Sequence, residues 1–262
     1  MSSSSYVVTD SMTMLRRSLR HGIRYPVMLV SSLVTPIILL LMFVYILGGT
    51  MGAGMGGGSG RTEYLNYIAP SMILLTVCYG GGTTAVMVSV DLTEGIVKRF
   101  RTMPISRSAV LTGHVIGGTI RTMATVTLVL LVALLMGFSP TSTPVEWLAA
   151  FGVLTLLGIA LTWLSIAFGA QAKSPGGAGT AMLPLQLLPL VSSAFVPTDS
   201  MPTAVRLFAE YQPFTPVIDT VRGLLMGSEI GNSGYLAMGW LIGVLLVGFL
   251  WARAAFNRRG RG

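Results

Sequence analysis

Apolar residues along this chain fall into long runs, and short segments between the runs hold nearly all of the charge. A bilayer core about 30 Å thick requires about 20 apolar residues in a helix. Six runs meet this requirement, and we predict membrane spans at residues 27–47, 64–90, 108–138, 147–172, 174–198 and 230–252. The pattern therefore predicts an all-α polytopic membrane protein, with a six-span domain over residues 27–256.

The stretch between the fifth and sixth runs, residues 199–229, has a different pattern. It holds too many charged side chains for a span that faces lipid. Its apolar residues nevertheless recur at helical spacing, as Phe214, Val217, Ile218, Val221, Leu224 and Leu225. Two prolines in YQPFTP, Pro213 and Pro216, lie at the start of this stripe, where a helix begins or breaks. We predict a helix–break–helix at one membrane face, lying in the interface or re-entering the membrane.

The N-terminal segment, residues 1–26, carries an amphipathic pattern. Met12, Leu15, Leu19 and Ile23 share one helical face, and the other faces hold arginines that include Arg16, Arg17 and Arg20. This pattern predicts an interfacial helix lying against anionic lipid. The alternative is a disordered basic tail.

A second amphipathic segment lies between the second and third runs. Its apolar face consists of Ile96, Val97, Phe100 and Met103, and its other face holds Lys98, Arg99 and Arg101. The helix should end near Pro104, because the residue before a proline disfavours helical geometry. A solvated basic loop would suffice to set topology, but topology requires no apolar face. We therefore expect a short helix that docks into a groove of a partner.

The composition supports a membrane protein whose charge sets its orientation. The chain has 262 residues, of which 10% are charged, and its net charge is +8; soluble domains are about one quarter charged. No zinc-ligand or aromatic RNA-binding motif supports a nucleic-acid partner. Thirteen of the 17 basic residues fall on the side of the termini and three on the other side. The positive-inside rule then places both termini, including the basic tail 257–262, in the cytoplasm.

Arg121 is the one basic residue within a predicted span. If the third span begins near Thr122, this arginine lies at the membrane boundary and extends its charge toward water. If the span begins near Val110, the arginine is deep and needs a partner. We favour the boundary position.

The sequence offers little for catalysis. Gly57–Gly60 (GGSG) matches a serine-protease motif of rhomboids, but both histidines, His21 and His114, fall near the opposite membrane face. The chain contains a single cysteine, Cys78, and no HExxH zinc motif or P-loop. We therefore expect no enzyme activity, no bound metal and no ATP site in this chain. An ion-coupled carrier, a membrane scaffold and an intramembrane enzyme are the alternatives to a transport subunit.

Two motifs resemble the permease subunits of type-2 ABC exporters, and in particular their daunorubicin-resistance (DrrB-like) branch. In TEGIVKRFRTMPISRSAVLTGHV, the matching residues are Glu94, Arg99, Phe100, Arg101, Pro104 and Arg107. Gly95 directly follows the glutamate, where the family pattern has one residue between them, and Met103 replaces the usual leucine. Arg121 matches a basic position after this loop. In YQPFTPVIDTVRGLLMG, the matching residues are Pro213, Thr215, Pro216, Val217, Arg222, Leu224, Leu225 and Gly227, and Gln212 replaces an asparagine.

This resemblance implies an exporter in the bacterial cell membrane. Two permeases would form a dimer, identical or paralogous, and each would dock a separate ATPase subunit that binds ATP and magnesium. The segment around Glu94–Pro104 would be the coupling helix in a groove of that ATPase. The broken helix pair, with Pro213, Thr215, Pro216, Asp219 and Arg222, would form an outer gate. The first, second and fifth spans would line a path for lipophilic or amphipathic compounds such as drugs, antibiotics or lipids.

Overall fold

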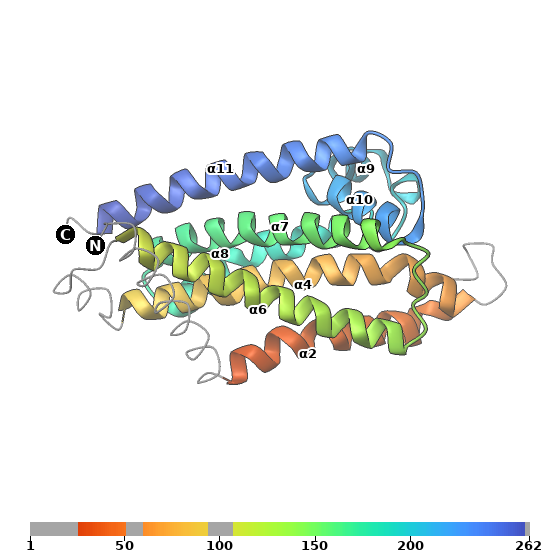
Figure 1. The fold of residues 1–262 in the computed structure, drawn as a ribbon, viewed down its shortest axis with the longest axis horizontal. Coiled ribbons are helices and arrows are strands. Elements are labelled where there is room, and N and C mark those ends of the chain that lie inside the picture. Colours follow the sequence, from red (N-terminus) through yellow and green to blue (C-terminus); the bar gives the residue numbers. More distant parts are fainter. Residues whose placement is uncertain (1–25, 51–59, 94–106, 260–262) are drawn as a thin grey trace.

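The computed structural model describes residues 26–50, 60–93 and 107–259, and every regular element in these ranges is a helix. The long helices lie side by side in an elongated bundle (Figure 1). They are α2 (Pro26–Met42) with the π turn η1 (Phe43–Leu47), α4 (Gly60–Thr93), α6 (Arg107–Leu135), α7 (Pro144–Gln171) and α11 (Ser233–Arg259). Among the described residues, five helices are long and apolar enough to cross a membrane. The prediction of an all-α polytopic membrane protein is confirmed.

Helix α4 forms the centre of the bundle. Its apolar window is 78% buried, whereas the corresponding window of α11 is 22% buried. It packs against α2, α6, α7, α8 and α10. Ile68, Met72 and Leu74 of α4 are fully buried, and they contribute to a core that all of these neighbours also line, α8 through the partly buried Leu185. The surrounding helices keep apolar faces on the outside of the bundle, as expected for helices that face lipid.

The sequence predicted a fifth span at residues 174–198. The structure corrects this prediction, because these residues do not form one continuous helix. Helix α8 (Pro175–Leu187) is capped at its N-terminus by Ser174, whose hydroxyl accepts a hydrogen bond from the backbone N–H of Gly177. It continues only as the 3₁₀ turn η2 (Leu188–Val191), and the backbone is extended at Ser192. Pro184 and Pro189 lie in this path, and proline removes a backbone donor and interrupts a helix. The two helical pieces together cover about 28 Å, close to the thickness of a hydrocarbon core.

The helix–break–helix expected after this span is present. A short 3₁₀ turn, η3 (Thr198–Ser200), leads into α9 (Thr203–Tyr211), and α10 (Phe214–Met226) follows. The break lies at Gln212 and Pro213, where YQPFTP predicted it. Helix α10 ends at Gly227, which has a φ of 70°, a conformation that glycine adopts without strain. The apolar stripe of α10 is buried against α11, α7 and α4, so α10 is inserted among the long helices.

The two ends of the bundle differ in their contents (Figure 1). At one end, which we call the α9–α10 end, α4, α7 and α11 begin and the helix pair α9 and α10 is inserted. At the other, which we call the basic end, α4, α7 and α11 end and α6 and α8 begin. The α7–α8 connection at the basic end contains Lys173, and the last two turns of α11 contain Arg253, Arg258 and Arg259. Helix α11 extends past residue 256, where we predicted the end of the six-span domain.

Candidate functional site

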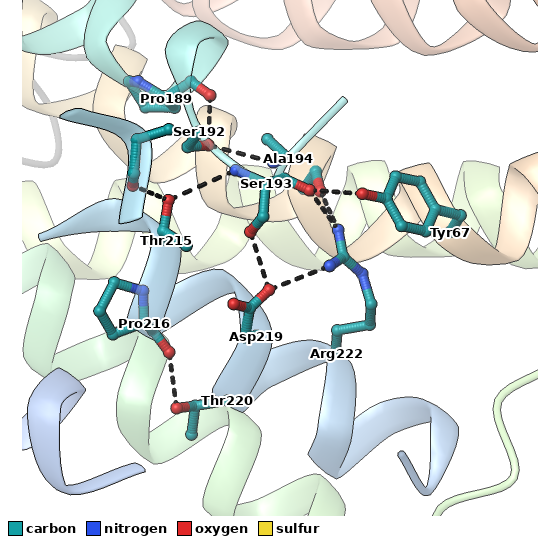
Figure 2. A network of polar contacts seen from close by, with 12 residues as sticks. Tyr67, Pro189, Ser192, Ser193, Ala194, Thr215, Pro216, Asp219, Thr220 and Arg222 are labelled. Carbon is teal, nitrogen blue, oxygen red and sulfur yellow. Dashed lines mark hydrogen bonds and ion pairs between the residues drawn. The ribbon is translucent and has the colours of Figure 1, made fainter. Parts of the chain in front are cut away.

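A network of polar contacts at the α9–α10 end centres on Arg222 of α10 (Figure 2). Its Nη1 donates a hydrogen bond to Oδ1 of Asp219 (3.1 Å), one turn earlier on the same helix. Its Nη2 donates to the carbonyl of Ser193 (2.9 Å) and to Oγ of Ser71 on α4 (3.3 Å). The guanidinium carbon lies 4.0 Å from the ring centroid of Tyr67, a cation–π geometry. One arginine thus joins α10, α4 and the end of the broken span.

Ser193 is the second centre of this network. Its carbonyl accepts a hydrogen bond from the Tyr67 hydroxyl (2.7 Å) as well as from Arg222, and its backbone N–H donates to Oγ1 of Thr215 (3.3 Å). The chain has left helical geometry here, so its backbone groups need other partners. At membrane depth, irregular backbone persists only where protein or water supplies those partners. Side chains of α4 and α10 supply them for the broken span.

The Asp219 carboxylate accepts hydrogen bonds from the Ser193 hydroxyl (2.8 Å) and from Arg222. Burial raises the pKa of Asp219 above its usual value of 3.8, although both of these partners act to lower it. Removal of water from the carboxylate therefore has the larger effect. The network holds a charged pair in a place that disfavours charge.

The break between α9 and α10 is held by two further contacts. The Gln212 side-chain amide donates to the carbonyl of Val191 (2.6 Å), which ties the break to η2. The Thr215 hydroxyl donates to the carbonyl of Ala209 (2.5 Å), which ties the first turn of α10 to the end of α9. The junction between the two helices is therefore fixed against the end of α8 and η2.

The predicted gate residues meet in or beside this network. Thr215, Asp219 and Arg222 take part in it directly, whereas Pro213 and Pro216 set the first turn of α10. Sequence reasoning missed Tyr67, Ser71 and Ser193. The available signal was weak: a serine pair, 192–193, follows two prolines in an apolar run.

The structure places Arg121 away from the start of its helix. Helix α6 begins at Arg107, so Arg121 lies fourteen residues into it and within the apolar window Leu111–Leu135. Helix α6 does not begin near Thr122, but the start of a helix does not locate the membrane boundary, so the boundary position that we favoured stays a prediction. The arginine interacts electrostatically with Asp91 of α4. Asp91 also pairs with His114 of α6, a contact that the sequence analysis did not foresee.

Two other sets of predicted residues lie outside the described ranges. They are the interfacial-helix arginines Arg16, Arg17 and Arg20, and the coupling segment from Glu94 to Pro104. The helices that flank the coupling segment are described, since α4 ends at Thr93 and α6 begins at Arg107, both at the basic end (Figure 1). Within the described part of the chain, no group of three or more His, Cys, Asp or Glu side chains is arranged to hold a metal ion.

Comparison with known proteins finds ABC transporter permeases of similar sequence. Over 185 residues the chain is 27% identical to a daunorubicin resistance ABC transporter permease protein, DrrB1, of Streptomyces coeruleorubidus, an alignment that covers 70% of this chain and 62% of that protein. It is 22% identical over 180 residues to a probable doxorubicin resistance ABC transporter permease protein, DrrC, of Mycobacterium tuberculosis, which covers 69% and 65% of the two chains. The chain thus spans less than two thirds of the length of each relative.

The sequence pattern of the ABC-2 type transporter family matches residues 9–226, which include the coupling segment, the broken span and the helix pair α9 and α10. The described helices within this range form one bundle with the polar network at one end. The chain therefore belongs to the ABC-2 type transporter family, as a multi-pass membrane permease that resembles the drug-resistance ABC permeases.

Proposed function

We propose that this chain is the membrane-spanning subunit of an ATP-driven exporter, which moves lipophilic or amphipathic compounds outward with a separate ATPase subunit. One observation carries the proposal. The family match includes the predicted coupling segment and spans a bundle in which the helix ends that flank this segment lie at the basic end, opposite the Arg222 network. An exporter needs these two features on opposite sides of the membrane, one for energy input and one for release.

The proposal fixes an orientation. The basic end would face the cytoplasm, in keeping with the positive-inside rule, and the α9–α10 end would face outward. Both termini would be cytoplasmic, and the protein would reside in a bacterial cell membrane. The drug-resistance names of the similar permeases support small lipophilic cargo. A second copy of the chain would complete the path, and ATP and magnesium would bind to the ATPase subunit.

The Arg222 network would then be the outer gate in its closed form. Arg222 holds the unwound segment after η2 against α4 and α10. Opening would require its contacts with Ser193 and Ser71 to separate. Because these contacts also satisfy the backbone of the broken span, the closed form would be stable in the absence of ATP.

The experiment that tests the proposal is co-purification with the ATPase subunit. Phe100→Asp places a charge on the predicted apolar docking face, so the variant should reach the membrane but lose the ATPase. Thr102→Asp places the same charge on the other side of the predicted helix, and this variant should retain the ATPase subunit. An ATPase that stays bound to Phe100→Asp would contradict the proposed docking face.

The contact between Asp91 and His114 favours a second candidate, an ion-coupled carrier. Such carriers hold ionisable groups at membrane depth, and this pair lies between α4 and α6 with Arg121 nearby. The two candidates differ in their energy source. Cargo transport in vesicles that requires ATP and the ATPase subunit supports the exporter. Transport that proceeds without ATPase and stops on addition of a protonophore supports the carrier.

A further inference from the structure

The predicted coupling segment is flanked by two helices that share a largely buried polar contact, which we call the Asp91–His114 contact. Nε2 of His114 on α6 lies 3.2 Å from Oδ2 of Asp91 on α4, and the two side chains are only 15% and 12% exposed. Asp91 is two residues from the end of α4, and His114 is two turns from the start of α6. Arg121, two turns further along α6, acts on the same carboxylate. The contact therefore joins the two helix ends between which residues 94–106 are inserted.

Buried polar contacts contribute little net stability, because the loss of hydration offsets their attraction. Their better-attested use is to fix one arrangement of neighbouring elements. The contact is therefore better suited to setting the position of α4 relative to α6 than to stabilising the fold.

The same two helices stay in close contact beyond this pair. A Cβ placed on Gly80 of α4 would lie 2.2 Å from Oγ1 of Thr122 on α6, and one on Gly118 of α6 would lie 3.1 Å from Oγ1 of Thr84 on α4. Such close backbone approach leaves little room for the helices to slide. From the Asp91–His114 contact to Gly80, α4 and α6 form one packed unit.

At its other end α4 reaches the Arg222 network. Ser71 and Tyr67 contact Arg222, and Asn66 exchanges two hydrogen bonds with Ser139 just after α6, at 3.1 and 3.2 Å. The 21 residues from Ser71 to Asp91 cover about 30 Å in a helix, the thickness of a hydrocarbon core. One helix thus carries the Asp91–His114 contact at one end and contacts the Arg222 network at the other.

We propose that Asp91 and His114 are positioning residues for energy coupling, which hold α4 to α6 beside the coupling segment. A displacement of that segment then moves both helix ends together, and α4 conveys it to the Arg222 network. Without the contact, the segment would bend two separate helix ends and its motion would be absorbed locally. This inference rests on the proposed function and assigns a role to residues outside the docking face and the gate.

The test uses the full chain with its ATPase subunit in lipid vesicles and measures cargo moved per ATP hydrolysed. Asp91→Asn and His114→Gln replace the carboxylate and the imidazole by amides with little change of volume, and the double variant completes a cycle. Each single variant should lower the ratio about fivefold or more, the smallest effect typical of coupled sites. The double variant should lose no more than either single variant, because both act through one contact. Glu63→Gln makes the same chemical change at the other end of α4 and should leave the ratio unchanged.

Melting temperature and ATPase co-purification are measured on the same samples. The inference holds if the ratio falls while the variants keep the ATPase subunit and hydrolyse ATP. It is overturned if transport and ATP hydrolysis fall in proportion, which indicates only a folding role, or if the ratio is unchanged. A wild-type chain that transports nothing with ATP and the ATPase subunit would instead refute the proposed function itself.

Discussion

At the scale of single residues, Arg222 contacts residues that lie far apart in the sequence. Its side chain is 14% exposed, and it contacts a residue one turn away, a serine on α4 and the carbonyl of Ser193. Arginine suits this place because its planar fork donates several hydrogen bonds at once. Lysine has the same charge but concentrates it at one point. The geometry, more than the charge, should therefore decide how the network tolerates substitution.

We predict that Arg222→Lys lowers the free energy of unfolding by about 1–3 kcal/mol, the usual cost of losing buried hydrogen bonds to a charged group. Denaturant unfolding in detergent, followed by tryptophan fluorescence, measures this change. Arg206→Lys is the matched control on α9, where Arg206 pairs with Asp199 and Glu210 at the surface. Exposed pairs contribute little, so this control should unfold like the wild type. Equal free energies of unfolding for Arg222→Lys and Arg206→Lys would contradict the role proposed for the planar guanidinium of Arg222.

Asp219 should make stability depend on pH. Its pKa in the folded chain lies above 3.8, so the folded state binds the proton at a higher pH than the unfolded state does. The free energy of unfolding should therefore rise, relative to Asp219→Asn, as the pH falls through the folded pKa, and this contribution should be lost as the pH rises. Unfolding of both proteins between about pH 7 and about pH 4 covers this window. If the free energy of unfolding of the wild type relative to Asp219→Asn falls as the pH is lowered, the ion pair with Arg222 outweighs burial in its effect on the pKa of Asp219.

At the scale of elements, close packing of α4 depends on glycines in its middle. Gly80, Gly81 and Gly82 face α6, α7 and α8, respectively, and a Cβ on Gly82 would lie 1.7 Å from the side-chain nitrogen of Gln186. Small residues let helix backbones approach within a membrane, where van der Waals packing holds helices together. The burial of α4 therefore results from its small residues as much as from its apolar ones.

Gly80→Ala should separate α4 from α6, because the new Cβ would lie 2.2 Å from Oγ1 and 2.8 Å from Cγ2 of Thr122. Overpacking of this kind costs about 1–3 kcal/mol, which a lowered melting temperature in detergent would report. Thr122→Ala removes both clashing atoms and should restore much of the loss in the double variant. Gly152→Ala on α7 is the control, since nothing lies within 4 Å of its Cβ position. If Gly80→Ala and Gly152→Ala have the same melting temperature, the close approach of α4 to α6 at Gly80 is wrong.

Much of the architecture at this scale follows from hydropathy. Long apolar runs predicted α2, α4, α6, α7 and α11, because a bilayer demands length and low charge. YQPFTP predicted the break at Gln212 because proline acts locally. The interruption after Leu187 was missed, since an apolar run containing prolines reads as a span. The contacts of Ser193 and Asp91 were also missed, because tertiary packing brings their partners from distant helices.

At the scale of the whole molecule, α4 links two polar clusters through an apolar bundle. One is the Asp91–His114 contact at the basic end and the other is the Arg222 network at the α9–α10 end. Apolar side chains of α4 lie between them, including Met72 and Leu75, both buried. Polar groups at both ends with an apolar middle suit an element that passes from one membrane face to the other. The proposed function requires these two ends to lie on opposite sides of one membrane.

Cysteine labelling in intact cells tests this requirement. Ser228→Cys lies in the exposed turn after α10 and Gln171→Cys at the exposed end of α7, so they mark the α9–α10 end and the basic end. The native Cys78 is the chain's single cysteine and is buried, so it should give no background signal. A membrane-impermeant maleimide should label Ser228→Cys in intact cells and Gln171→Cys only after permeabilisation. The positive-inside rule gives this order, because Lys173 follows Gln171 closely in the chain and the arginine-containing end of α11 lies at the same end of the bundle. Labelling of both positions from outside, or the reverse order, would mean that the basic end does not face the cytoplasm and that the coupling segment cannot meet an ATPase there.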